Sequence, residues 1–118
     1  TVEVATPPEF NKGVPGIWSP EHLFVASANV CLMTTFLAIS ENSGLDFVSY
    51  SCKANGKLEK VDRAFMITEI TLEPEIVLPA GGDIGRAERL IQKSEANCLI
   101  SNSMKTKINL LPKISVKG

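Results

Sequence analysis

The chain has little of what metal centres and disulfide-rich domains require. Its 118 residues include only three cysteines and one histidine, and no two cysteines are separated by just two residues. Structural zinc sites use four cysteine or histidine ligands, usually in closely spaced pairs, so the composition argues against one. An odd number of scattered cysteines also argues against a secreted disulfide framework.

The chain also lacks an excess of charge of either sign. Twelve basic and thirteen acidic residues give a formal net charge of −1, and a dedicated nucleic-acid binder is usually clearly basic. We therefore expect no nucleic-acid partner. Hydrophobic residues make up 44% and charged residues 21%, which is typical of a folded globular protein. The length predicts a single domain, residues 1–118, with a core large enough to fold without a metal or disulfide.

The first residues of the sequence do not show the pattern expected of a secretory leader. The chain begins at Thr1 rather than methionine, and no charged segment followed by an apolar run is present. We expect the chain to be a fragment or a trimmed product. Residues 1–5 alternate as a short strand, and the prolines and glycines of residues 6–18 predict an irregular loop.

One long apolar helix dominates the predicted structure. Ser19 and Pro20 form a strong helix start, and the helix is predicted to run to Ser43, just before Gly44. Residues 23–39 are apolar on nearly every face, which is typical of a membrane span or of the buried centre of a globule. Polar residues interrupt the run, so we favour burial and expect no membrane partner; they are Ser27, Asn29, Thr34 and Thr35.

The rest of the chain is predicted to form strands around this helix. Residues 45–54 read as a strand, and Asn55-Gly56 permits either a tight hairpin or a bulge within one strand that continues to Val61. Residues 65–78 form a second β segment, whose far end Pro74 should place at an edge or a bend.

A second helix and a last strand complete the predicted order. Asp83 should cap a helix that reaches about Asn97, and residues 105–116 read as one strand. This order of strand, helix, strands, helix and strand predicts an α+β fold, with an antiparallel sheet wrapping one very buried helix.

The cysteines by themselves do not identify a reaction. A cysteine inside a buried helix is first of all a small apolar residue, and this applies to Cys31 and to Cys52 in its strand. Cys98 differs because it closes a helix and precedes a polar bend. From spacing alone, a redox pair of Cys31 and Cys98 remains one alternative to simple packing.

Two motifs around these cysteines resemble the OsmC/Ohr family of osmotically inducible protein C and the organic hydroperoxide resistance proteins. Residues 19–31 are similar to the opening of the family's central helix, with a proline-glutamate pair, small residues, and Cys31 ten positions after Glu21. The run Cys98-Leu99-Ile100-Ser101-Asn102 is similar to the family's second cysteine motif, with Leu99 where a proline is common. The resemblance extends over residues 2–116, although the N-terminal part of the usual family domain is absent.

The resemblance implies a cytoplasmic thiol peroxidase that acts on organic hydroperoxides or hydrogen peroxide. Cys31 would be the nucleophile that becomes a sulfenic acid, and Cys98 would condense with it to a disulfide. An external thiol or dithiol would reduce that disulfide, so no bound cofactor or metal is implied. The resemblance also implies an intertwined homodimer with its sites at the subunit interface.

The charged residues of the site are the part that the sequence leaves open. The family supplies an arginine from a segment upstream of residues 2–5, and none of Arg63, Arg86 and Arg89 holds a matching position. A desolvated thiolate needs such a cation or a hydrogen-bond donor. Ten helical residues rise about 15 Å, so Glu21 either serves the Cys31 of a second chain or is only a helix-start acid.

Two other interpretations stay open at this stage. One is a non-catalytic relative, a dimer that binds a small hydrophobic ligand and whose cysteines are incidental. The other is an unrelated α+β structural domain. The sequence assigns no role to Cys52, for which packing is the default.

Overall fold

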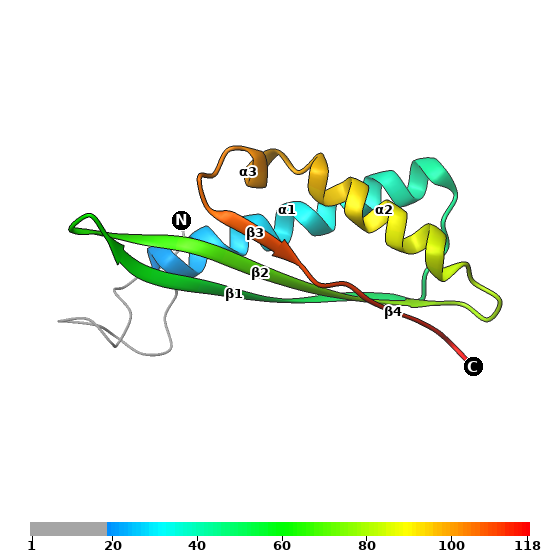
Figure 1. Cartoon of the computed structure of the whole chain (residues 1–118). Coiled ribbons are helices and arrows are strands. Elements are labelled where there is room, and N and C mark those ends of the chain that lie inside the picture. The colour runs from blue at the N-terminus through cyan, green and yellow to red at the C-terminus, as the bar shows by residue number, and fades with distance from the viewer. Residues whose placement is uncertain (1–18) are drawn as a thin grey trace.

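The computed structural model describes residues 19–118, in which two helices lie along one face of a twisted sheet (Figure 1). The predicted short strand of residues 1–5 and the predicted loop of residues 6–18 lie outside the described residues. The elements are α1 (Pro20–Ser43), β1 (Ser49–Val61), β2 (Ala64–Leu78), α2 (Ile84–Ala96), α3 (Leu99–Asn102), β3 (Lys107–Leu110) and β4 (Lys113–Val116). The predicted α+β class is confirmed.

Helix α1 begins and ends where the sequence predicts. The Ser19 hydroxyl accepts a hydrogen bond from the backbone N–H of His22 at 3.1 Å, and the His22 ring accepts one from the Ser19 N–H at 3.2 Å. At the other end Gly44 adopts a left-handed conformation with φ of 67°. A left-handed residue ends a helix by allowing the last carbonyls to be capped, and glycine does so without strain.

Only one stripe of α1 is buried within the chain. Ala28, Leu32, Phe36 and Ser40 are buried, whereas several large apolar side chains of other faces are exposed: Leu23, Phe24, Val30, Met33 and Leu37. The expectation of a helix buried on every face is therefore not met by a single chain, because the sheet and α2 cover one side of it. By length and composition α1 could cross a membrane, and its buried stripe packs in the core that it shares with β2 and α2.

Strand β1 resolves the two alternatives at Asn55-Gly56. It runs without interruption from Ser49 to Val61, with a register shift between Lys57 and Leu58, so the hairpin there is wrong and the continuous strand with a bulge is confirmed. A Cβ atom at Gly56 would lie 2.6 Å from the Val25 side chain, so glycine is needed there for the close approach of α1. The chain reverses instead at residues 62 and 63, which both have positive φ.

The sheet is mixed rather than antiparallel. Strands β1 and β2 pair antiparallel, but β3 and β4 each pair with β2 in parallel. The antiparallel prediction is wrong for this half because α2 and α3 carry the chain from the end of β2 back along that strand to the level of Glu69, and such a crossover joins parallel strands. The single predicted strand of residues 105–116 is likewise divided into two short ones.

Pro74 lies inside the central strand β2, so its predicted place at an edge or bend is wrong. It pairs with Cys52 of β1, and on the other side of β2 it falls between the segments that pair with β3 and β4. Proline has no N–H to donate to a ladder. The interruption between β3 and β4 therefore coincides with the residue that could not have paired there.

The second helix places the second cysteine over α1. Asp83 caps α2 as predicted, accepting a hydrogen bond from the backbone N–H of Arg86 at 3.0 Å. Buried apolar residues of α1, α2 and β2 form one core: Ala28, Leu32, Phe36, Ile70, Leu72, Ile76, Leu78, Ala87 and Ile91. Because α2 shares this core with α1, the turn after α2 is held next to the middle of α1.

Candidate functional site

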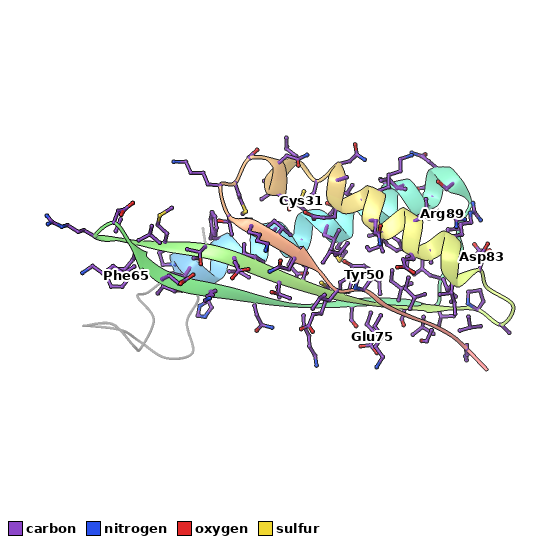
Figure 2. The ribbon with its side chains drawn as sticks, in the orientation of Figure 1. Cys31, Tyr50, Phe65, Glu75, Asp83 and Arg89 are labelled. Atoms are coloured by element: carbon purple, nitrogen blue, oxygen red, sulfur yellow. The ribbon has the colours of Figure 1, made fainter. Side chains whose placement is uncertain are left out.

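The fold brings Cys31 and Cys98 together. Cys31 lies in the middle of α1, and Cys98 is the residue that precedes α3 as its N-cap. The two side chains hydrogen-bond to each other, and both thiols are free. Figure 2 shows Cys31 beneath the segment that joins α2 to α3. Two cysteines far apart in sequence thus form one local thiol pair.

Hydrogen-bond donors surround the Cys31 sulfur. Burial by itself raises the pKa of this thiol, but hydrogen bonds from Cys98, the Ile100 backbone, Thr35 and the Leu99 backbone outweigh it, so the pKa lies below its ordinary value. The Thr35 hydroxyl lies 3.9 Å from the sulfur. Sequence analysis missed these donors; the spacing of four residues between Cys31 and Thr35, one helical turn, could have indicated Thr35.

Cys98 has the opposite environment. It is fully buried, and burial raises the pKa of its thiol. The hydrogen bond with Cys31 and the charge of that neighbour raise it further, whereas the hydroxyl and backbone N–H of Ser101 oppose the shift. The two thiols therefore differ in acidity, and Cys31 loses its proton at a lower pH than Cys98 does.

Glu21 lies apart from this pair. It stands in the first turn of α1, and ten helical residues separate it from Cys31 by about 15 Å along the axis. The structure does not bring the two together within one chain. Among residues 19–118 the buried carboxylate oxygen Oε2 of Glu21 has no hydrogen-bond partner.

None of the three arginines reaches the thiol pair. Arg63 lies at the turn between β1 and β2, and Arg86 donates a hydrogen bond to the Ser43 carbonyl. Figure 2 shows Arg89 well away from Cys31. Within the described part of the chain, hydrogen-bond donors rather than a cation lower the pKa of Cys31.

Cys52 belongs to a different part of the molecule. It lies on β1, packs against the core, and its backbone carbonyl accepts a hydrogen bond from Asn29 at 3.4 Å. Burial raises the pKa of its thiol, opposed by hydrogen bonds from Tyr50 and the Glu73 backbone. This environment agrees with a packing role. No group of three or more His, Cys, Asp or Glu side chains in residues 19–118 is placed to hold a metal ion.

The unequal environments predict a selective titration of the thiols. Alkylation of Cys31 by iodoacetamide should reach half its maximal rate at a lower pH than an ordinary thiol, because hydrogen bonds favour its thiolate. Cys98→Ala should move that midpoint upward, because alanine cannot donate a hydrogen bond to the Cys31 sulfur. Peptide mass spectrometry after timed labelling measures each site, and an unchanged midpoint in Cys98→Ala would contradict the coupling.

Comparison of the sequence with known families identifies similar proteins. A family model described as OsmC-like protein matches residues 13–111. The chain is 33% identical over 92 residues to peroxiredoxin OsmC of Escherichia coli K12, which covers 78% of this chain and 64% of that protein. It is 26% identical over 102 residues to the uncharacterized protein YmaD of Bacillus subtilis, covering 84% and 68% of the two chains. The chain thus spans less than two thirds of the length of the E. coli relative.

Solved structures with the same fold are also similar. An OsmC-like protein of unknown function from Vibrio cholerae superposes with a TM-score of 0.83 at 25% identity, covering 92% of this chain and 75% of that one. An organic hydroperoxide resistance protein from Elizabethkingia anophelis superposes with a TM-score of 0.79 at 21% identity, covering 98% and 81%. At the lower identity the likeness concerns the fold alone.

Proposed function

The chain belongs to the OsmC family, and we propose that it is a thiol-dependent peroxidase that reduces organic hydroperoxides through Cys31 and Cys98. The observation that carries the proposal is the thiol pair, in which one pKa is lowered and the other raised. The lowered pKa makes Cys31 the proposed nucleophile, because the thiolate and not the thiol attacks a peroxide. The name of the E. coli relative supports the same chemistry.

The proposed cycle has three balanced steps. The Cys31 thiolate attacks the terminal oxygen of the hydroperoxide, the O–O bond breaks, and the alkoxide takes a proton to leave as an alcohol. Cys98 then attacks the Cys31 sulfenic acid, a disulfide forms, and the hydroxyl group leaves as water. An external dithiol reduces this disulfide by exchange and is itself oxidised, so the protein needs no cofactor of its own.

Apolar groups beside the thiols support an organic substrate. Val30, next to Cys31 in α1, is 53% exposed, and Leu99, next to Cys98, is 72% exposed. An alkyl or aryl group can cover such surface and remove it from water, which hydrogen peroxide cannot do. We propose the cytoplasm as the site of action, since the reduced thiols that the cycle needs persist there.

We also propose that the protein is a homodimer. Besides Val30, α1 leaves four large apolar side chains exposed, and a second copy would cover them; they are Leu23, Phe24, Met33 and Leu37. The buried Glu21 oxygen lacks a donor among residues 19–118, so a role for Glu21 at the partner's site fits its position. Light scattering should give twice the 12.8 kDa chain mass, and a monomer at micromolar concentration would contradict both proposals.

The peroxidase proposal is tested by mapping the disulfides after one turnover. Reduced protein is mixed with one equivalent of cumene hydroperoxide and digested under alkylating conditions. We expect a disulfide between Cys31 and Cys98, formed equally in the matched control Cys52→Ser. If both thiols stay free while the peroxide persists, the enzymatic proposal is wrong, and a dimer that binds a small hydrophobic ligand becomes the better explanation.

A further inference from the structure

Three residues of α1 that lie about one helical turn from Cys31 carry a hydroxyl group. The hydroxyl of Ser27 donates a hydrogen bond to the Phe24 carbonyl at 2.6 Å, and that of Thr34 donates one to the Cys31 carbonyl at 3.1 Å. Such bonds to the backbone of the preceding turn are common for serine and threonine in helices. The Thr35 hydroxyl instead lies 3.9 Å from the Cys31 sulfur. Of the three, Thr35 is the residue whose hydroxyl contacts the reactive atom.

The helix itself fixes this contact. Side chains four residues apart lie on one face of a helix, and each leans toward the N-terminus, so the Thr35 side chain extends toward Cys31. Leu32 and Phe36, which directly follow these two residues, are fully buried and hold this part of α1 against the core. Cys31 and Thr35 are themselves only partly buried, so a small molecule can reach both.

The separation of the two atoms suits an additional oxygen. A thiolate has no proton, so the Thr35 hydroxyl is the donor when Cys31 is in its reactive form. The hydroxyl oxygen and the sulfur are 3.9 Å apart, whereas an O–H···O hydrogen bond is about 2.7–2.8 Å long. An oxygen bonded to the sulfur on this side lies one covalent bond closer to the hydroxyl. Thr35 is therefore better placed to bind the oxygen that Cys31 acquires than to bind the sulfur.

We propose that Thr35 is a catalytic residue whose hydroxyl donates a hydrogen bond to the terminal oxygen of the hydroperoxide while this oxygen is transferred to Cys31. The role rests on the proposed peroxidase function. The Cys31 sulfur bonds to the terminal hydroxyl group, the O–O bond breaks, and its electron pair leaves with the alkoxide, which takes a proton from water. Thr35 keeps its own proton. Its hydrogen bond holds the O–O bond in line with the attacking sulfur.

Thr35→Val tests this role, because valine keeps the β-branched shape but has no hydroxyl. Two reagents separate the effects that the variant can have. Cumene hydroperoxide transfers an oxygen to Cys31, whereas iodoacetamide requires only the thiolate. Both rates are measured above the pH at which alkylation of each variant becomes maximal, so that Cys31 is fully ionised. Rapid quenching followed by peptide mass spectrometry counts the Cys31 that is still unmodified.

We expect Thr35→Val to slow the hydroperoxide reaction about tenfold, the order of magnitude of one lost hydrogen bond. Its limiting alkylation rate should stay within about twofold, because the nucleophilicity of a thiolate depends only weakly on its pKa. Thr35→Ser keeps the hydroxyl and should recover most of the hydroperoxide rate. If Thr35→Val slows both reactions equally, or slows neither, the hydroxyl does not act on the oxygen and the proposal is wrong.

Thr34→Val is the matched control for this experiment. It makes the same substitution at the next position of α1, where the hydroxyl donates to the backbone and not to the sulfur. Both of its rates should equal those of the wild type. A tenfold loss of the hydroperoxide rate in Thr34→Val as well would show a general effect of removing a hydroxyl from this turn, and would contradict the specific role of Thr35.

The same measurements distinguish failure of this role from failure of the proposed function. A hydroperoxide rate that depends on Thr35, without any disulfide between Cys31 and Cys98, would uphold the role of Thr35 and reject the proposed cycle. A Cys31–Cys98 disulfide that forms equally fast in Thr35→Val and in the wild type would uphold the cycle and reject the role of Thr35. A wild-type hydroperoxide rate no greater than that of free cysteine would reject both.

Discussion

Cys31→Ser removes hydroperoxide consumption down to the rate of the assay without protein. Serine keeps the shape of the side chain, but its hydroxyl stays protonated at neutral pH and cannot take up the peroxide oxygen as a thiolate does when it becomes a sulfenic acid. The loss should exceed about 10³-fold, as for the removal of other covalent nucleophiles. Consumption of cumene hydroperoxide in the presence of excess dithiothreitol measures it.

Two further variants make this expectation specific. Cys98→Ala should still consume one equivalent of peroxide, since Cys31 is intact, but more slowly because one donor to its thiolate is removed, and a dione-trappable sulfenic acid should accumulate. Cys52→Ser should behave as the wild type, because Cys52 packs on β1 and does not contribute to the Cys31 environment. Turnover in Cys31→Ser at the wild-type rate would reject the assignment of the nucleophile.

Phe36→Ala destabilises the fold by about 3–5 kcal/mol, the usual cost of removing a buried aromatic side chain. Phe36 is fully buried on the same helix as Cys31, and its ring centroid lies 5.5 Å from that of Phe47 and 5.4 Å from that of Tyr50. The variant leaves a cavity where α1 meets the sheet. Urea unfolding followed by circular dichroism, at one fixed protein concentration, measures the change.

Phe65→Ala is the matched control for this change. Phe65 lies near the tip of the β1–β2 hairpin and is 64% exposed, so the same chemical deletion should cost at most about 1 kcal/mol. Figure 2 shows its position toward the end of the hairpin. Equal losses in the two variants would show that the packing of α1 on the sheet does not dominate the stability.

The ends of the helices were predictable from the sequence because their causes are local. Ser19 and Gly44 bound α1, and Asp83 starts α2, each through hydrogen bonds or backbone geometry within a few residues. The two cysteine motifs were predictable for a similar reason, since each is a short run of residues that resembles a family pattern. The family resemblance that these motifs indicated is confirmed by the match of the OsmC-like family model.

The sheet was less predictable because strand pairing is not local. Nothing near residues 105–116 indicates that they pair in parallel with β2, since this follows from the crossover through α2. Pro74 was predicted to lie at an edge or bend because proline breaks a ladder, yet β1 pairs past it without a break and the interruption lies on the other side of β2, between β3 and β4. A rule about a single strand cannot foresee that the pairing is interrupted between β3 and β4 rather than in β2 itself.

The sequence by itself determined which thiols were candidates, where the long helix begins and ends, and which family the chain resembles. Only the tertiary structure decided how those thiols differ. Groups from α1 and from the start of α3 lower the pKa of the Cys31 thiol, whereas burial raises the pKa of the neighbouring Cys98 thiol. A pKa depends on the solvent and the donors that surround a group in space, and these are set only when α2 packs against α1 and brings distant segments together.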